Sequence, residues 1–355
     1  MLVEPGSLCW VGGRMVEARD GPTWAVEFAR FSALSGVVRD DGSGLGKGLK
    51  LERARRRAEG QPDLEDSLDI FHTFREGGRA LRKTWGAASR ALERAEAAQK
   101  ELDRLGRAGE SRTGHATRTS RLWRQAEGLW DQALAAERAW KLTRSAFEFF
   151  TPEGRFNDRQ QARAVVAAAL PHLSGPAWAK TRRLLRRRES FTFLDQAQRR
   201  LAELGLDPDV LSALLDLEGL RRQAWRLSES TPGSAATRAW ALARTVQLAK
   251  AEPHWQDLAG RVREVLRGVW RASSLVECIN SVARMHQGRH RKMTQGLLDL
   301  KRLYWNLHQF RAGHRKNQTP YGLFGLKLPA LSFWEFLRMT PEELRKQLSA
   351  TDDVP

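Results

Sequence analysis

The sequence predicts a helix-dominated α+β protein, and two observations carry this prediction. Over the first 75 residues, short apolar runs alternate with helical patterns, which is typical of an α/β region. From about Glu76 to Val269 the chain is rich in Ala, Leu, Glu, Arg and Trp, and its apolar residues recur at helical spacing. We therefore expect four segments: an α/β region at 1–75, an all-helical domain at 76–264, a further part at 265–336, and a C-terminal helix and tail at 337–355.

The N-terminal region begins with a predicted strand that is broken by a turn, followed by its return strand. Leu2-Val3 and residues 8–11 flank a Glu-Pro-Gly turn, and a Gly-Gly pair predicts a hairpin whose return strand covers residues 14–18. The remaining elements of this region are then expected in the order helix (24–34), strand (36–38), helix (45–58), and a short strand at 67–72 that runs into a helix.

The central region contains turn signals rich in Gly, Pro, Ser and Asp, and these divide it into six to eight predicted helices. Most of the tryptophans lie in or after this region, and at helical spacing a tryptophan is usually a core residue. Near the C-terminus, Thr340, Pro341 and Glu342 predict the start of a helix, because they supply a cap, a first-turn proline and an acid at the positive end of the dipole.

The net charge of +18 is the first functional signal. Such a surplus of Lys and Arg favours a polyanionic partner, usually nucleic acid, and such binding weakens with salt. Frequent use of Arg in a GC-rich genome is an alternative source of the charge. No apolar stretch is long enough for a transmembrane helix, no signal peptide is evident, and Cys9 and Cys278 fit reduced core thiols, so a cytoplasmic protein without a membrane partner is expected.

Asp40 and Asp41 follow the apolar strand at 36–38. A carboxylate at the carboxyl end of a strand lies where α/β proteins bind ligands, and carboxylate oxygens are preferred by Mg²⁺. The alternative is an Asp-Gly turn that only starts the next helix.

Glu277 is the second candidate site residue. On a helix, its neighbours at spacings of three and four are small polar residues, including Ser273 and Asn280, and Arg284 lies one further turn on. This environment suits a metal-binding carboxylate that faces a phosphate backbone, whereas the alternative is a solvated helix face.

Asp69 and His72 form a third pair, expected to lie close together at the junction between strand and helix. A single histidine is more often structural than catalytic. The other histidines fit neither a Ser-His-Asp arrangement nor a metal-type cluster.

Taken in order, three sequence stretches resemble the DDE transposases of bacterial insertion sequences, in particular the hAT-like branch. They are Val37-Val38-Arg39-Asp40-Asp41-Gly42-Ser43-Gly44-Leu45, Asp69-Ile70-Phe71-His72, and Arg271-Ala272-Ser273-Ser274-Leu275-Val276-Glu277-Cys278-Ile279-Asn280-Ser281.

The resemblance implies an RNase H-like core interrupted by a large all-helical insertion, with the last core helix in residues 265–336. It implies that Asp40 and Glu277 are catalytic Mg²⁺ ligands, with Asp41 in reserve, and that Asp69 and His72 are accessory residues that position DNA. It further implies two Mg²⁺ ions, double-stranded DNA with transposon ends as partner, and a homo-oligomer on that DNA. The expected DNA-binding residues are Arg271, Ser273, Asn280, Arg284, Arg289, Arg291 and Lys292.

The family's first catalytic Asp lies on a strand upstream of the hairpin, and neither Glu4 nor Asp20 matches that position. The expectation from sequence is therefore an N-terminally truncated member of the DDE lineage, with an incomplete Mg²⁺ site and weak or no strand transfer. The alternative is a non-enzymatic, basic, helical protein that binds DNA or RNA by charge.

Overall fold

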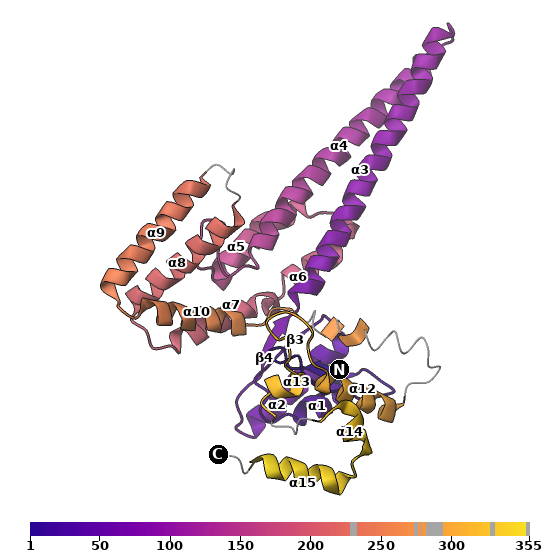
Figure 1. Cartoon of the computed structure of the whole chain (residues 1–355). Coiled ribbons are helices and arrows are strands. Elements are labelled where there is room, and N and C mark those ends of the chain that lie inside the picture. Colours follow the sequence, from indigo (N-terminus) through magenta and orange to yellow (C-terminus); the bar gives the residue numbers. More distant parts are fainter. Residues whose placement is uncertain (228–232, 273–275, 278, 282–293, 327–330, 353–355) are drawn as a thin grey trace. The chain divides into compact units, whose positions relative to one another are not determined.

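The structure is a computed structural model that describes residues 1–227, 233–272, 276–277, 279–281, 294–326 and 331–352. Helices dominate and the few strands are short, which confirms a helix-dominated α+β protein. The chain divides into two compact units (Figure 1). Unit 1 combines Met1–Glu65 with Ala272–Pro355, and unit 2 is the intervening Asp66–Arg271. Within the described ranges, no helix is both long and apolar enough to cross a membrane.

Unit 1 opens with β1 (Leu2–Val3) and β2 (Trp10–Gly12), which pair antiparallel with Leu2 opposite Gly12. The predicted return strand at 14–18 is wrong, because these residues have no strand structure. Instead, the backbone before and within this stretch bonds a distant side chain. The Gln295 amide accepts a hydrogen bond from the Met15 N–H at 2.9 Å and donates one to the Gly13 carbonyl at 3.3 Å.

The other early elements of unit 1 follow the predicted order. Asp20 caps α1 (Gly21–Ala29) by accepting a hydrogen bond from the Thr23 N–H at 3.0 Å, and a proline lies in the first turn. The strand β3 (Gly36–Arg39) leads into α2 (Ser43–Ala58). The core of this region is small: its fully buried members are Phe28, Leu49 and Leu64.

The side chain of Asn306 joins the C-terminal part of unit 1 to β2 by two hydrogen bonds. Asn306, which is fully buried, accepts from the Trp10 N–H at 2.9 Å and donates to the Trp10 carbonyl at 3.1 Å. The predicted helix start at Thr340 is confirmed, since its hydroxyl accepts from the Glu343 N–H. The helices are α12 (Gln295–Leu307), α13 (Pro320–Leu323), α14 (Phe333–Arg338) and α15 (Pro341–Asp352).

The boundary between the units falls within β4 (Glu65–Leu68). Unit 2 then begins with a long helical hairpin of α3 (Ile70–Arg107) and α4 (Thr113–Ser145) (Figure 1). The two helices approach closely because small residues line the contact: Gly77 packs directly against the Trp140 ring, and Ala91 and Ala95 are buried with Ala126.

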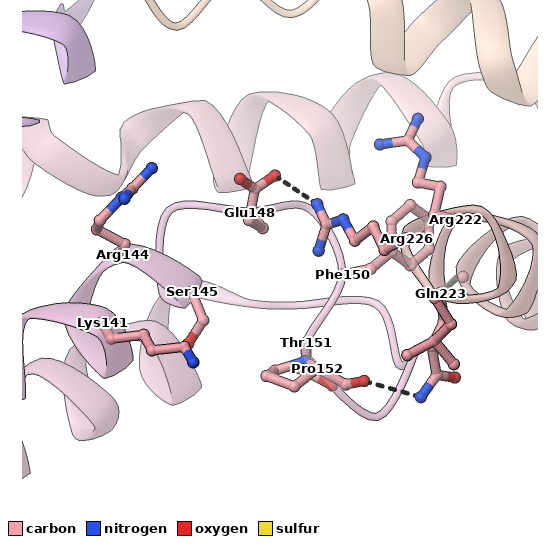
Figure 2. Close-up of a pocket in the computed structure, with 12 residues that line it drawn as sticks. Lys141, Arg144, Ser145, Glu148, Phe150, Thr151, Pro152, Arg222, Gln223 and Arg226 are labelled. Carbon is pink, nitrogen blue, oxygen red and sulfur yellow. Dashed lines mark hydrogen bonds and ion pairs between the residues drawn. The ribbon is translucent and has the colours of Figure 1, made fainter. Parts of the chain in front are cut away.

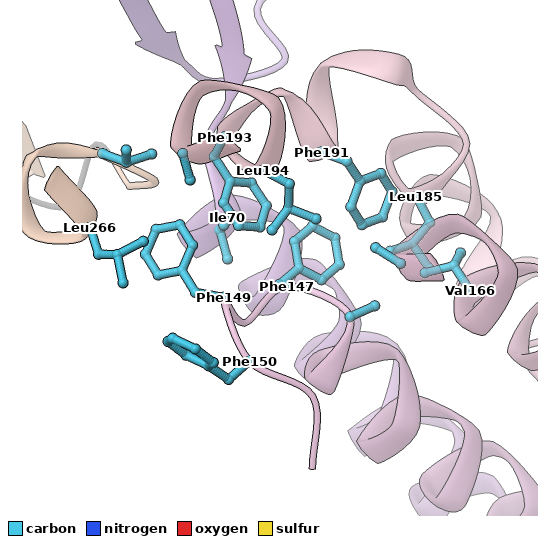
Figure 3. Close-up of a cluster of buried hydrophobic side chains, with 14 of the residues drawn as sticks. Ile70, Phe147, Phe149, Phe150, Val166, Leu185, Phe191, Phe193, Leu194 and Leu266 are labelled. Atoms are coloured by element: carbon cyan, nitrogen blue, oxygen red, sulfur yellow. The ribbon is translucent and has the colours of Figure 1, made fainter. Parts of the chain in front are cut away.

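The rest of unit 2 is helical, as predicted, and it encloses an aromatic core (Figure 3). The Phe147 ring stacks on Phe191 with centroids 4.8 Å apart, and Phe149 meets Phe193 edge-on at 5.7 Å. The remaining helices of the unit are α5 (Arg159–Ala169), α6 (Ala179–Leu185), α7 (Thr192–Ala202), α8 (Pro208–Arg226), α9 (Ser234–Ala251) and α10 (Trp255–Gly268), with short 3₁₀ helices at Leu170–His172, Pro176–Trp178 and Arg188–Phe191.

The expectation that tryptophans are core residues is correct only in part. Trp140 and Trp178 are buried in unit 2, but the side chains of Trp225 and Trp240 are exposed by 88% and 68%. Helical spacing alone therefore does not tell which tryptophans this unit buries.

Candidate functional site

The predicted strand-end carboxylates lie at the junction between β3 and α2. Asp40 follows the last residue of β3 directly, and its Oδ1 accepts a hydrogen bond from the Gly42 N–H at 2.9 Å. A Cβ at residue 42 would lie 2.8 Å from that same oxygen, so a larger residue there would displace the Asp40 carboxylate. Asp40 therefore closes the turn that starts α2, and both Asp40 and Asp41 remain half-buried.

Glu277 lies in a helical stretch of the same compact unit. Residues 276–277 and 279–281 are helical, Glu277 and Asn280 are half-buried, and Ile279 is buried. Of the other residues expected to bind DNA in this part of the chain, Ser273, Arg284, Arg289, Arg291 and Lys292 lie outside the described residues, as does Cys278.

Asp40, Asp41 and Glu277 supply the oxygen donors that Mg²⁺ prefers. However, no group of three or more His, Cys, Asp or Glu side chains suited to a metal ion occurs among the residues that the structure describes. The donor chemistry of these carboxylates thus suits Mg²⁺, but the described residues do not form a complete ligand set.

Asp69 and His72 lie in direct contact, as expected, at the start of α3 in unit 2. The Asp69 carboxylate is the cap of α3: one oxygen accepts from the Phe71 N–H at 2.7 Å, and the other lies 2.5 Å from Nδ1 of His72. The Asp69 side chain is completely buried, whereas His72 is 17% exposed. The pair therefore has a structural role at a helix terminus, which can coexist with the predicted accessory role.

Arg271 is bound within unit 2. Its guanidinium donates to the Phe147 carbonyl at 2.7 Å, lies 3.6 Å from the Glu148 carboxylate, and stacks on Phe149 at 4.7 Å. Burial lowers the pKa of this guanidinium, and the charge of Glu148 opposes that shift. These contacts anchor the segment after α4, so Arg271 stabilises unit 2; its binding to DNA stays a prediction.

Cys9 fits the expected reduced core thiol. It is buried and not in a disulfide, and burial raises the pKa of its thiol to about 11, so the thiol is protonated at neutral pH.

Sequence reasoning missed a basic pocket in unit 2. The pocket has a volume of about 360 Å³, and Glu148 lies in its wall (Figure 2). Arg271 approaches the same carboxylate. The sequence offers one signal for this pocket, which is the spacing of its cations. Lys141 and Arg144 lie three residues apart near the end of α4, and Arg222 and Arg226 lie four apart near the end of α8. Its lining residues are Lys141, Arg144, Ser145, Glu148, Phe150, Thr151, Pro152, Gly219, Arg222, Gln223, Arg226 and Leu227.

No protein-family model, no curated protein and no solved structure matches the chain.

Proposed function

We propose that the chain is a DNA-binding protein of the DDE transposase lineage, in which Asp40 and Glu277 are phosphoryl-transfer carboxylates. One observation carries this proposal. Unit 1 is assembled from two stretches that are far apart in sequence, and the helical unit 2 is inserted between them. The resemblance to DDE transposases implies this layout, in which a helical insertion interrupts the core. The proposal includes an RNase H-like fold for that core.

The positions of the two carboxylates agree with this layout. Asp40 directly follows a strand of unit 1, and Glu277 lies on a helical stretch of unit 1 that follows the insertion. When bound, Mg²⁺ would supply Lewis-acid stabilisation of charge on a phosphoryl oxygen. The contribution of this chain is to hold two half-buried carboxylates on elements of one compact unit.

The charge of +18 supports duplex DNA as the partner. Transposon ends as the specific target and a homo-oligomer on DNA belong to the same proposal. In this proposal the Asp69–His72 pair of unit 2 is accessory and contacts the DNA strand.

The test is metal-directed cleavage of the polypeptide, which needs no catalytic turnover. Fe²⁺ is added in place of Mg²⁺ with ascorbate and peroxide, and the fragments are mapped by mass spectrometry. We expect cleavage near both residue 40 and residue 277, and its loss in Asp40→Asn and Glu277→Gln. Asn at position 40 still accepts the Gly42 hydrogen bond, so the turn is preserved.

The matched control is Glu17→Gln, which removes one carboxylate charge from an exposed position of unit 1. This variant should keep the cleavage pattern of the parent chain. Cleavage at neither site, or cleavage that persists in both Asp40→Asn and Glu277→Gln, would contradict the proposed metal ligands.

A second candidate is a non-enzymatic, basic, helical nucleic-acid-binding protein. It is favoured by the structural use of two predicted site residues, because Asp40 closes a turn and Asp69 caps a helix. This candidate predicts that the chain binds DNA or RNA in a salt-dependent manner. It also predicts no metal-directed cleavage at residues 40 and 277, so the cleavage experiment distinguishes the two candidates.

A further inference from the structure

The basic pocket of unit 2 lies between the last turns of two helices. Lys141 and Arg144 come from the end of α4, and Arg222 and Arg226 come from the end of α8 (Figure 2). The segment that follows α4 completes the wall and contributes Glu148, the one carboxylate among the described residues that line the pocket.

The cations of the pocket outnumber their partners. Arg226 approaches Glu148 at 3.3 Å, and this carboxylate is shared with Arg271; Arg222 pairs with Glu218 at 2.9 Å. Arg144 lies over the Phe74 ring at 5.3 Å, and neither it nor Lys141 has a carboxylate partner among the described residues.

The simplest explanation for cations at these positions is that they complement the negative ends of two helix dipoles. That explanation accounts for only part of the charge. Among the described residues, the lining cations together with Arg271 are five, and their acidic partners Glu148 and Glu218 are two, which leaves a surplus of three. Two helix C-termini offset about one unit of charge, since each carries roughly half, so a surplus of about two remains for a ligand.

The wall of the pocket is fixed by a backbone contact that only glycine permits. A Cβ on Gly219 of α8 would lie 1.8 Å from the Gly154 carbonyl oxygen. Gly154 has a φ of +82° and closes the turn that begins at Thr151. The amide of Gln223 donates to the Pro152 carbonyl at 3.0 Å and ties the same turn to α8. The turn at Thr151–Gly154 and the α8 wall that carries Arg222 and Arg226 are therefore fixed to each other before any ligand binds.

We propose that this pocket binds a phosphate group of the DNA backbone. The surplus of about two positive charges is enough to neutralise a backbone phosphodiester, which carries one negative charge, and arginine guanidinium groups bind phosphate oxygens in pairs of hydrogen bonds. The assignment to DNA rests on the proposed function, whereas the assignment to phosphate rests on the pocket alone. Phosphate from a small molecule has the same chemistry, so the experiment has separate arms for the two sources.

The first arm probes phosphate on the unmodified chain. Arginines are modified with phenylglyoxal in the presence or absence of pyrophosphate at constant ionic strength, and each site is quantified by mass spectrometry. We expect pyrophosphate to slow modification of Arg144 and Arg226 several-fold and to leave Arg121 and Arg124 unaffected. Equal protection of all four would overturn the pocket as a phosphate site.

The second arm measures duplex DNA binding by fluorescence anisotropy between about 50 and 200 mM salt. Lys141→Gln/Arg144→Gln is compared with Arg121→Gln/Arg124→Gln, which removes the same charge from exposed positions on the same helix, at least ~25 Å away along its axis. We expect the pocket variant to bind about tenfold more weakly than the control, and its salt slope should be lower by about one for each phosphate that it no longer neutralises.

A third variant changes the shape of the pocket without changing its charge. Gly219→Ala displaces the Gly154 turn, whereas Gly260→Ala on α10 adds a methyl group in open space and serves as its control. Once circular dichroism shows that both variants are folded, we expect only Gly219→Ala to lose pyrophosphate protection.

The outcomes separate the two proposals. If the parent chain does not bind duplex DNA, the proposed function fails. The pyrophosphate arm still tests whether the pocket binds phosphate. If the pocket variant loses pyrophosphate protection at Arg226 but binds DNA like its control, DNA is overturned as the source of the phosphate. If it behaves like its control in both arms, the inference as a whole is overturned.

Discussion

The two compact units are stabilised in different ways. Unit 2 encloses a continuous core that includes Phe147, Phe191, Phe193 and Trp178. The first stretch of unit 1 has a small core cluster of Phe28, Leu49 and Leu64, and Cys9 and Trp10 are buried outside that cluster. Apolar burial is non-directional and adds up with area, so unit 2 gains most of its stability from its core. The stability of unit 1 depends more on individual polar contacts, and each of these is directional, so it forms only at a particular distance and angle.

Two buried polar residues illustrate this dependence in unit 1. Arg56, 3% exposed, lies 3.0 Å from the Glu52 carboxylate and donates to the Phe31 and Leu34 carbonyls. Asn306 performs the equivalent role for the Trp10 backbone. The unit that carries the candidate carboxylates is therefore held by directional bonds, whereas the unit that carries the basic pocket is held by packing.

The largest effect is expected in the core of unit 2. Phe147→Ala removes a ring that packs against Phe191 and Phe193, and it should lower the free energy of unfolding of that unit by about 3–5 kcal/mol. Hydrogen exchange measured by mass spectrometry along a urea series reports each unit separately, since a chain of two units need not unfold in one step. Leu142→Ala, at an exposed position of α4, is the control. Comparable destabilisation in both variants would show that the aromatic core does not dominate.

A smaller but clear effect is expected in unit 1. Glu52→Gln leaves the buried Arg56 without its carboxylate and should cost about 2–3 kcal/mol, below the usual range for a broken buried pair, because glutamine still accepts a hydrogen bond. Glu59→Gln, which removes the exposed partner of Arg55 on the same helix, should cost less than about 1 kcal/mol.

The Glu52 pair also predicts a pH dependence. Hydrogen bonds from Arg55, and then from Arg56, lower the pKa of the Glu52 carboxyl against the opposing effect of burial. A lowered folded-state pKa means that the stability is present above the unfolded value and is lost as pH falls through the folded value. The difference between the parent chain and Glu52→Gln should therefore shrink on acidification, and a difference that grows would contradict the pair.

The sequence revealed those features whose causes are local. Thr340 indicates a helix start because its hydroxyl bonds the backbone N–H three residues on. The proximity of Asp69 and His72 follows from the same local geometry. The hairpin error at 14–18 has a non-local cause, since its backbone bonds Gln295.

The pocket was missed for the same reason. Beyond their spacing, nothing in the sequence distinguishes its cations from those of other helices. The turn and α8 are brought together around them by the contact between Gly154 and Gly219 and by the hydrogen bond from Gln223 to Pro152. The pattern of exposed and buried tryptophans likewise depends on which helices pack together, which periodicity does not encode.

The smallest effect tests whether burial, and not charge alone, makes a polar contact important in unit 1. Arg53 forms two hydrogen bonds with the Asp63 carboxylate, at 2.8 and 2.6 Å, and lowers the pKa of Asp63 from 3.8 to about 2. The carboxylate is 40% exposed, so solvent screens the pair, and Asp63→Asn should cost less than about 1 kcal/mol near neutral pH. Because the pKa is lowered, this contribution is present above 3.8 and disappears as pH falls towards 2. Urea unfolding of Asp63→Asn and the parent chain at several acidic pH values checks both points. A destabilisation as large as that of Glu52→Gln would mean that ion pairs stabilise unit 1 whether or not they are buried.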